Sequence, residues 1–224
     1  MRTASIVACA TLAVGALAPL TATSAATAPL PRTEVRADDY PAALAAFYTQ
    51  QLAWESCKDG MSCAWLSVPL DYADPTGKAI RLRVARVKAT GDPAARQGSL
   101  VLHPGGPGGS AIDFTSYVAQ SITPKVNEQF DIVGFDPRGV DHSTPITCLT
   151  GRQTTALIRL DGTPDTAAEE RQLMSVVKMI PRGCLTKSPT LARHVGTENS
   201  VKDMDVLRAV LGDPHHLDVG FGGE

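Results

Sequence analysis

The stretch SLVLHPGGPGGS, residues 99–110, decides the fold of this chain. Its first part, Ser99 to His103, is a short, continuously apolar run, which is typical of a strand buried on both faces. A second run of the same kind, FDIVGF, occupies Phe130 to Phe135. Between the two runs, Ser110 to Ile122 has helical spacing. Buried strands that alternate with helices predict an α/β protein with a parallel sheet.

Other segments extend this prediction in both directions along the chain. The runs Ala64–Leu70 and Ile80–Ala89 indicate strands, and the alternation of apolar residues with arginine in the second predicts a half-exposed hairpin. The stretch from Thr150 to Pro189 is rich in threonine, proline and charge, so we expect it to form an excursion over the sheet. Further helices are predicted within Ala42–Trp54, Ala167–Ile180 and Ser200–Leu211.

The glycine-rich segment PGGPGGS, residues 104–110, is the candidate site of chemistry. Glycines allow positive φ and a close approach to a ligand, so their N–H groups can face a developing negative charge, as an oxyanion hole requires. A phosphate-binding loop would need a lysine that this segment lacks, and Pro107 removes one donor. A purely structural turn is the remaining alternative.

Three motifs in this order resemble the α/β-hydrolase peptidases that include proline iminopeptidases and the secreted tripeptidyl aminopeptidases of actinomycetes. They are the opening strand CAWLSVPLDY at Cys63–Tyr72, then PGGPGGS, and then FDIVGFDPRGV at Phe130–Val140 with Ser143–Pro145 after it. The matched order spans Trp54 to Gly220. The resemblance implies an α/β-hydrolase fold and a secreted serine hydrolase. It further implies an aminopeptidase that releases short peptides from free amino termini through an acyl-enzyme.

The resemblance also assigns roles to residues. The backbone N–H of Gly106 would donate to the oxyanion, and Gly105, Pro107 and Gly108 would shape the loop. We interpret Asp136 and Arg138, which follow a buried strand, as structural residues that cap turn amides and tie the loop together.

The last residues should contain the nucleophile. Thr197 to Leu211 resembles the helix before the nucleophile strand, and His216 to Val219 should be that strand, leading into a G-x-S-x-G elbow. The sequence instead reads GFGGE, with Gly222 at the expected serine position. The acid and histidine of the triad should follow later still. We therefore expect residues 40–224 to be the N-terminal part of a hydrolase domain, truncated at the nucleophile strand and inactive alone.

Two alternatives to the aminopeptidase remain open at this point. An esterase or lipase could use the same fold and oxyanion loop, because neither chooses between amide and ester. The chain could also be a non-catalytic remnant or a binding module. The parent enzyme would have a peptide substrate as its partner.

Other polar residues are weaker candidates. Ser110 at a helix start is expected to be an N-cap, and His103 at a strand end to be packed or solvated. We interpret His142 as a surface histidine. His215 and His216 would point to opposite faces of a strand, so we expect no metal site there, and no cofactor is predicted.

The N-terminal residues have the composition of an export signal. Arg2 is followed by an apolar run from Ile6 to Leu20 and then by small residues, which predicts a cleaved signal peptide over residues 1–26. The run is shorter than the roughly 20 residues that a membrane anchor needs. Residues 27–39 lack apolar periodicity and are expected to be a flexible arm. The predicted location is extracellular.

Charge and cysteine content limit the possible partners and the compartment. The net charge of -2 gives no basis for binding nucleic acid or, after signal cleavage, a membrane. Cleavage would remove Cys9 and leave an even number of cysteines in an oxidising compartment, so two disulfides are expected. Three pairings are possible, and buried free thiols are the alternative. The simplest pairing joins Cys57 to Cys63 and Cys148 to Cys184.

Overall fold

The computed structural model describes residues 36–106 and 108–213, and the backbone of residues 217–220. The predicted signal peptide and most of the predicted arm, Pro107, His215, His216 and Gly222 therefore lie outside the described residues. The last arm residues, Ala37–Asp39, form the short 3-10 helix η1. No helix in the described part of the chain is long and apolar enough to cross a membrane.

The described strands form one mixed sheet in the order β1-β2-β3-β5-β4-β6. Neighbours from β1 to β5 pair antiparallel, whereas β4 pairs parallel with both β5 and β6. The predicted parallel pair and the α/β class are confirmed. The strands are β1 (Glu55–Ser56), β2 (Ser62–Pro69), β3 (Ala79–Val87), β4 (Gly98–His103), β5 (Phe130–Phe135) and β6 (Leu217–Gly220).

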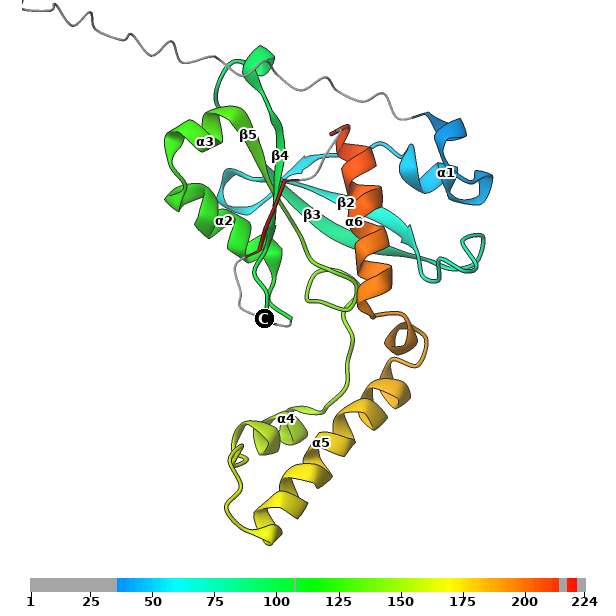
Figure 1. Cartoon of the computed structure of the whole chain (residues 1–224), viewed down its shortest axis with the longest axis vertical. Coiled ribbons are helices and arrows are strands. Elements are labelled where there is room, and N and C mark those ends of the chain that lie inside the picture. Colours follow the sequence, from blue (N-terminus) through cyan, green and yellow to red (C-terminus); the bar gives the residue numbers. More distant parts are fainter. Residues whose placement is uncertain (1–35, 107, 214–216, 221–224) are drawn as a thin grey trace, which may run out of the picture.

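Helices cover both faces of the sheet (Figure 1). On one face, α2 (Ala111–Ser121) packs on β3, β4 and β5, and α3 (Pro124–Gln129) contacts β5. On the other face, α6 (Thr197–Leu211) packs on β2 and on the short helix α1 (Ala42–Tyr48). The predicted helices are confirmed, with α6 beginning earlier than its apolar spacing indicated.

The core lies mainly between the sheet and α6. Leu66, Leu82 and Val84 point from β2 and β3 toward Val206 and Leu207 of α6, and all five are 0% exposed. Each such side chain contributes about 1.5–3 kcal/mol of transfer free energy when fully buried. This cluster therefore fixes α6 on the sheet.

The predicted β2–β3 hairpin is confirmed, including its exposed side. Trp65 pairs across the strands with Arg83 and remains 39% exposed. The guanidinium carbons of Arg81 and Arg83 each lie 4.8 Å from the centroid of the Trp65 ring. Farther along β3 the alternation ends, because Ala85 is covered by a cluster that includes Met61 and Ile112 of the α2 face.

Helices α4 (Gly151–Ile158) and α5 (Ala167–Lys187) form an excursion from the sheet, but they project away from it (Figure 1), whereas we predicted an excursion over the sheet. Neither helix contains a buried residue. We predicted that the second helix ends at Ile180, before Pro181, but α5 continues to Lys187. The Cys148–Cys184 disulfide and the close approach of Gly183 to the Cys148 carbonyl hold this last part of the helix.

Candidate functional site

The glycine loop follows β4, the strand from which the chain continues first to one side of the sheet and later to the other. The chain leaves β4, crosses through α2 to β5 on one side, and later returns through α6 to β6 on the other side of β4. Loops at the carboxyl ends of strands at such a switch point diverge and leave a crevice, where open α/β sheets bind ligands. His103 pairs with Gly220 in the β4–β6 register. Strands β4 and β6 therefore end side by side.

The loop backbone requires glycine. Gly105, Gly106 and Gly108 have φ values of 74°, 125° and 97°, a region that other residues rarely adopt. A Cβ atom on Gly106 would lie 3.1 Å from the Gly108 nitrogen and 3.2 Å from the Gly109 nitrogen. A side chain at position 106 would therefore strain the loop and crowd its amides.

His103 holds the beginning of the loop. Its Nδ1 atom accepts a hydrogen bond from the Gly105 N–H at 3.1 Å, so the neutral ring carries its proton on Nε2. The Gly106 N–H donates to no atom of the described residues. The arrangement thus occupies one loop amide and leaves the next available to a ligand.

Ser110 holds the end of the loop and caps α2, as predicted. Its hydroxyl accepts from the Asp113 N–H at 3.4 Å and donates to a carboxylate oxygen of Asp136 at 3.0 Å. A nucleophilic serine needs a base that accepts its proton, and here the hydroxyl is committed to a carboxylate in a capping arrangement. Ser110 therefore contacts the backbone of α2, and His103 contacts the backbone of the glycine loop.

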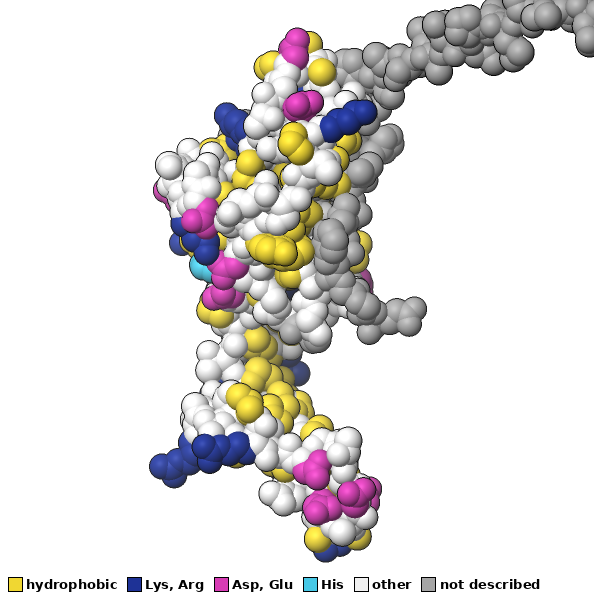
Figure 2. Space-filling model, turned by 90° about the vertical axis from the view of Figure 1, so that its left-hand side faces the viewer, with side chains coloured by type: hydrophobic (Ala, Val, Ile, Leu, Met, Phe, Trp, Pro, Cys, Tyr) yellow, Lys and Arg dark blue, Asp and Glu magenta, His cyan; other side chains and the backbone are white. Residues whose placement is uncertain are grey.

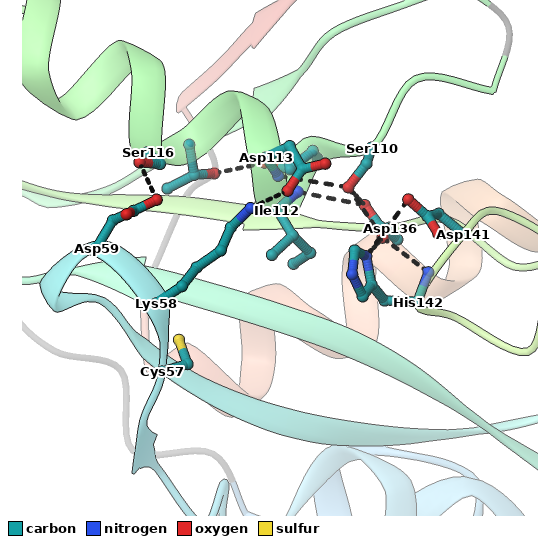
Figure 3. A network of polar contacts seen from close by, with 12 residues as sticks. Cys57, Lys58, Asp59, Ser110, Ile112, Asp113, Ser116, Asp136, Asp141 and His142 are labelled. Atoms are coloured by element: carbon teal, nitrogen blue, oxygen red, sulfur yellow. Dashed lines mark hydrogen bonds and ion pairs between the residues drawn. The ribbon is translucent and has the colours of Figure 1, made fainter.

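Asp136, at the carboxyl end of β5, is the centre of a polar network (Figure 3). Its carboxylate is completely buried and accepts from Ser110, from the Ile112 N–H at 3.3 Å and from the His142 N–H at 3.1 Å. The His142 ring adds a contact of 2.9 Å between its Nδ1 and Asp136 Oδ2. We predicted a surface position for His142, and its ring is 45% exposed, but its contact with Asp136 was not predicted.

The loop closed by the Cys57–Cys63 disulfide contacts the other side of α2 (Figure 3). Lys58 forms an ion pair with Asp113, and Asp59 accepts from the Ser116 hydroxyl at 2.7 Å. The hydrogen bond from Lys58 lowers the pKa of Asp113 below its usual range, and the same bond raises the pKa of Lys58. The helix that follows the glycine loop is thereby held from two directions.

Arg138 ties the turn after β5 to three other segments. It donates to both oxygens of Asp203 on α6 at 2.7 Å and to the carbonyls of Pro69, Leu70 and His194. The side chains of Arg138 and Asp203 are both 0% exposed. The sequence motifs did not identify Asp203 as the partner of Arg138, because the two residues lie 65 positions apart in the chain.

Burial is the largest influence on the pKa of Asp203. It raises the pKa of Asp203, although the hydrogen bonds from Arg138 and Tyr72 act in the opposite direction. Burial and the neighbouring Asp203 carboxylate also raise the pKa of the Tyr72 hydroxyl, which donates to Asp203 at 2.9 Å.

Asp136, Asp141 and His142 are the residues here that could bind a metal, since their ligand atoms lie within 4.8 Å of one another. Both Asp136 oxygens already accept hydrogen bonds from the protein. The group therefore forms a satisfied hydrogen-bond network in this structure, and we assign no metal to it.

The pairing of the cysteines is the simplest of the three possibilities. Cys57 bonds to Cys63, and Cys148 bonds to Cys184. Disulfides persist in oxidising compartments, so the pairing is consistent with an exported protein.

Comparison with known proteins identifies relatives with hydrolytic activities. The chain is 37% identical to the tripeptidyl aminopeptidase of Streptomyces lividans over 179 residues, which cover 75% of this chain and 33% of that protein. It is related to the actinomycete tripeptidyl aminopeptidases. The serine protease Hip1 of Mycobacterium tuberculosis is 36% identical over 183 residues, which cover 77% of this chain and 35% of that protein.

A third relative has an esterase name. Carboxylesterase B of Mycobacterium tuberculosis is 35% identical over 170 residues, covering 70% of this chain and 32% of the relative. No family model matches the chain. The chain spans about a third of the length of the curated relatives it matches. The names of these three relatives are those of two peptidases and one esterase, which are all hydrolases.

Proposed function

We propose that this chain is the part of a secreted serine aminopeptidase that carries the oxyanion-stabilising loop. The enzyme would release short peptides from free amino termini through an acyl-enzyme intermediate. The strand order, the crossovers on both faces and the glycine loop after β4 support an α/β-hydrolase fold.

The observation that carries this proposal is the backbone of the glycine loop. The Gly106 N–H donates to no described atom, and its loop follows β4, whose last residue His103 pairs with Gly220 at the end of β6. In the G-x-S-x-G arrangement, the nucleophile follows a strand at this edge and an amide of the neighbouring loop stabilises its oxyanion. Removing one such donor typically costs about 2.7–4 kcal/mol of transition-state stabilisation.

We also propose that the 224-residue chain does not hydrolyse peptides by itself. Gly222 stands where the resemblance places the serine, and glycine offers no nucleophile. Among the described residues, Ser110 donates to Asp136 and His103 accepts from Gly105, so this pair does not form a nucleophile and base. In this proposal, export follows from the predicted signal peptide and agrees with the two disulfides.

A chimeric enzyme tests the oxyanion role. Residues 98–140 of this chain would replace the corresponding segment of the Streptomyces lividans tripeptidyl aminopeptidase. We expect the chimera to release tripeptides, and Gly106→Ala in it to lower kcat about 100-fold or more. The matched control is Lys125→Ala, an exposed change on α3. Equal kcat values for the two variants would refute the oxyanion role of this loop.

Two measurements test the inactivity of the chain alone. A fluorophosphonate probe labels activated serines, so we expect no labelling of the purified chain under conditions that label the Streptomyces relative. Labelling at any serine would contradict the proposal. Sequencing the coding DNA from codon 205 onward, in all three frames, would show whether a G-x-S-x-G elbow, an acid and a histidine follow.

An esterase is the second candidate, and the carboxylesterase name of one relative favours it. The glycine loop stabilises the same oxyanion for esters and amides, so it does not discriminate between them. The chimera should be compared on a tripeptide anilide and on a short acyl ester. A preference that moves from anilide to ester when this segment is introduced would favour the esterase.

A further inference from the structure

We propose that His142 is a positioning residue that orients the Asp136 carboxylate and, through it, the end of the glycine loop. The inference rests on the oxyanion role proposed above. It concerns one side chain in the turn after β5, which touches neither a substrate nor the loop itself (Figure 3).

The two Asp136 oxygens join the turn after β5 to the start of α2. Oδ1 accepts from the Ser110 hydroxyl at 3.0 Å and from the Ile112 N–H at 3.3 Å, so it holds the junction of the glycine loop and α2. Oδ2 lies 3.2 Å from the same hydroxyl, accepts from the His142 N–H at 3.1 Å and contacts the ring Nδ1 at 2.9 Å. Rotation of the carboxylate would therefore disturb both sets of contacts together.

The His142 ring donates to Asp136 from Nδ1. An ionised carboxylate only accepts hydrogen bonds, so His142 Nδ1 carries a proton when it bonds to Asp136. The Asp141 carboxylate lies 3.6 Å from the same nitrogen. Asp113, whose pKa is lowered mainly by its hydrogen bond from Lys58, pairs with that lysine.

Asp136 and His142 differ in how far they are buried. Asp136 is 0% exposed, whereas the His142 ring is 45% exposed and covers Oδ2 from the solvent side. A buried carboxylate that loses a donor must find water or turn toward another donor. Turning would draw Oδ1 away from Ser110, and small displacements of positioned groups cost large factors in rate. His142 thus keeps the loop end in place without joining the chemistry.

Hydrogen–deuterium exchange on the full chain tests this inference. Removing the ring donor with His142→Ala should raise exchange in peptides spanning residues 104–114 about three- to tenfold, since it weakens a hydrogen bond to a charged group. His142→Asn retains a side-chain N–H near the Nδ1 position, so it should restore most of the protection. The control is Ser143→Ala, which removes a different bond of the same turn, from the Arg83 N–H at 2.7 Å.

Each outcome decides the question. Unchanged exchange in His142→Ala, or an equal rise in Ser143→Ala, would overturn the inference. If His142→Ala also loses protection in β2 and β3, the His142→Asn variant decides alone. Wild-type protection over residues 104–114 then supports the positioning role, and loss of protection there overturns it. No substrate is involved, so failure here leaves the chimera test of the proposed function unaffected.

Discussion

The buried Arg138–Asp203 pair provides the sharpest stability prediction. The change is Arg138→Met, which keeps an unbranched chain of similar length and removes the guanidinium. In the wild type, this group makes two bonds of 2.7 Å to Asp203 and three bonds to backbone carbonyls at 2.8–3.0 Å. The variant leaves a buried carboxylate and three carbonyls without that partner.

The expected loss of stability is large. Removing one partner of a buried ion pair costs about 3–5 kcal/mol, because the remaining charge stays desolvated. Domains are typically stable by about 5–15 kcal/mol, so Arg138→Met should remove a large share of the free energy of unfolding. The double variant Arg138→Met/Asp203→Leu removes both charges, so it should recover the part of the loss that comes from the uncompensated carboxylate, but not the lost bonds to the three carbonyls or from the Tyr72 hydroxyl.

The loss should also depend on pH. Burial raises the pKa of Asp203, and removal of Arg138 takes away an effect that lowers it. The folded state then binds a proton more readily than the unfolded state, so stability falls as the pH rises from the unfolded pKa through the folded one. The penalty of Arg138→Met should therefore be smaller at acidic pH than at neutral pH.

Urea denaturation followed by circular dichroism measures these differences. Glu198→Gln is the control, because Glu198 pairs with Lys202 at the exposed start of α6 and its loss should leave the midpoint unchanged. A loss below about 1 kcal/mol for Arg138→Met would refute the reasoning. A penalty independent of pH would refute the assignment of the uncompensated charge to Asp203.

Three further predictions concern other parts of the structure. Gly134→Ala should destabilise the chain by about 1–3 kcal/mol or more in thermal unfolding, because a Cβ would lie 2.0 Å from Thr115 Oγ1, whereas Gly162→Ala, in open space, should not. Removing the Cys148–Cys184 bond, which closes a loop across 36 residues, should cost about 4 kcal/mol by the chain-entropy estimate. It should also speed proteolysis within α4 and α5. An apolar cavity of about 560 Å³ between β4, α2 and α3 should bind an apolar dye, and Tyr117→Asp at its rim should weaken the fluorescence. Figure 2 shows hydrophobic side chains gathered on the face that bears these helices.

Much of the fold was predictable because its strands carry local patterns. The apolar runs of β4 and β5 indicated strands buried on both faces, and both strands begin and end within one residue of the prediction. The alternation of Ile80, Leu82 and Val84 with arginines gave the correct exposed side of β3. The pattern of buried and exposed residues is repeated along a strand, so the sequence of the strand alone predicts it, without knowledge of the segments that pack on it.

The length of α5 could not be predicted in this way. Proline removes a backbone donor and usually ends a helix, so the pattern favoured an end at Ile180. The helix continues because Cys184 is bonded to Cys148 and Gly183 allows a close backbone approach. These are contacts between segments that the sequence pattern does not report.

The candidate site was likewise predictable only where the local sequence determines the structure. Glycine spacing predicted the positive φ values of the loop, because only the local backbone determines which residues tolerate them. The sequence also marked Asp136 as a structural residue of its turn. It could not show that the His142 ring contacts Asp136. That contact depends on the backbone conformation of the turn between them, where Asp141 adopts a φ of 27°.

The network around Asp136 explains why a glycine-rich loop can serve as a fixed donor. A loop with several positive φ values has many accessible conformations when unfolded, so holding one of them has a high entropic cost. His103 fixes the first amide through Gly105, and Asp136 fixes the last residue through Ser110. Only the middle of the loop is left to a ligand. The same glycines that make the oxyanion geometry possible therefore require these two anchors, and a change at either anchor should act on the loop as strongly as a change within it.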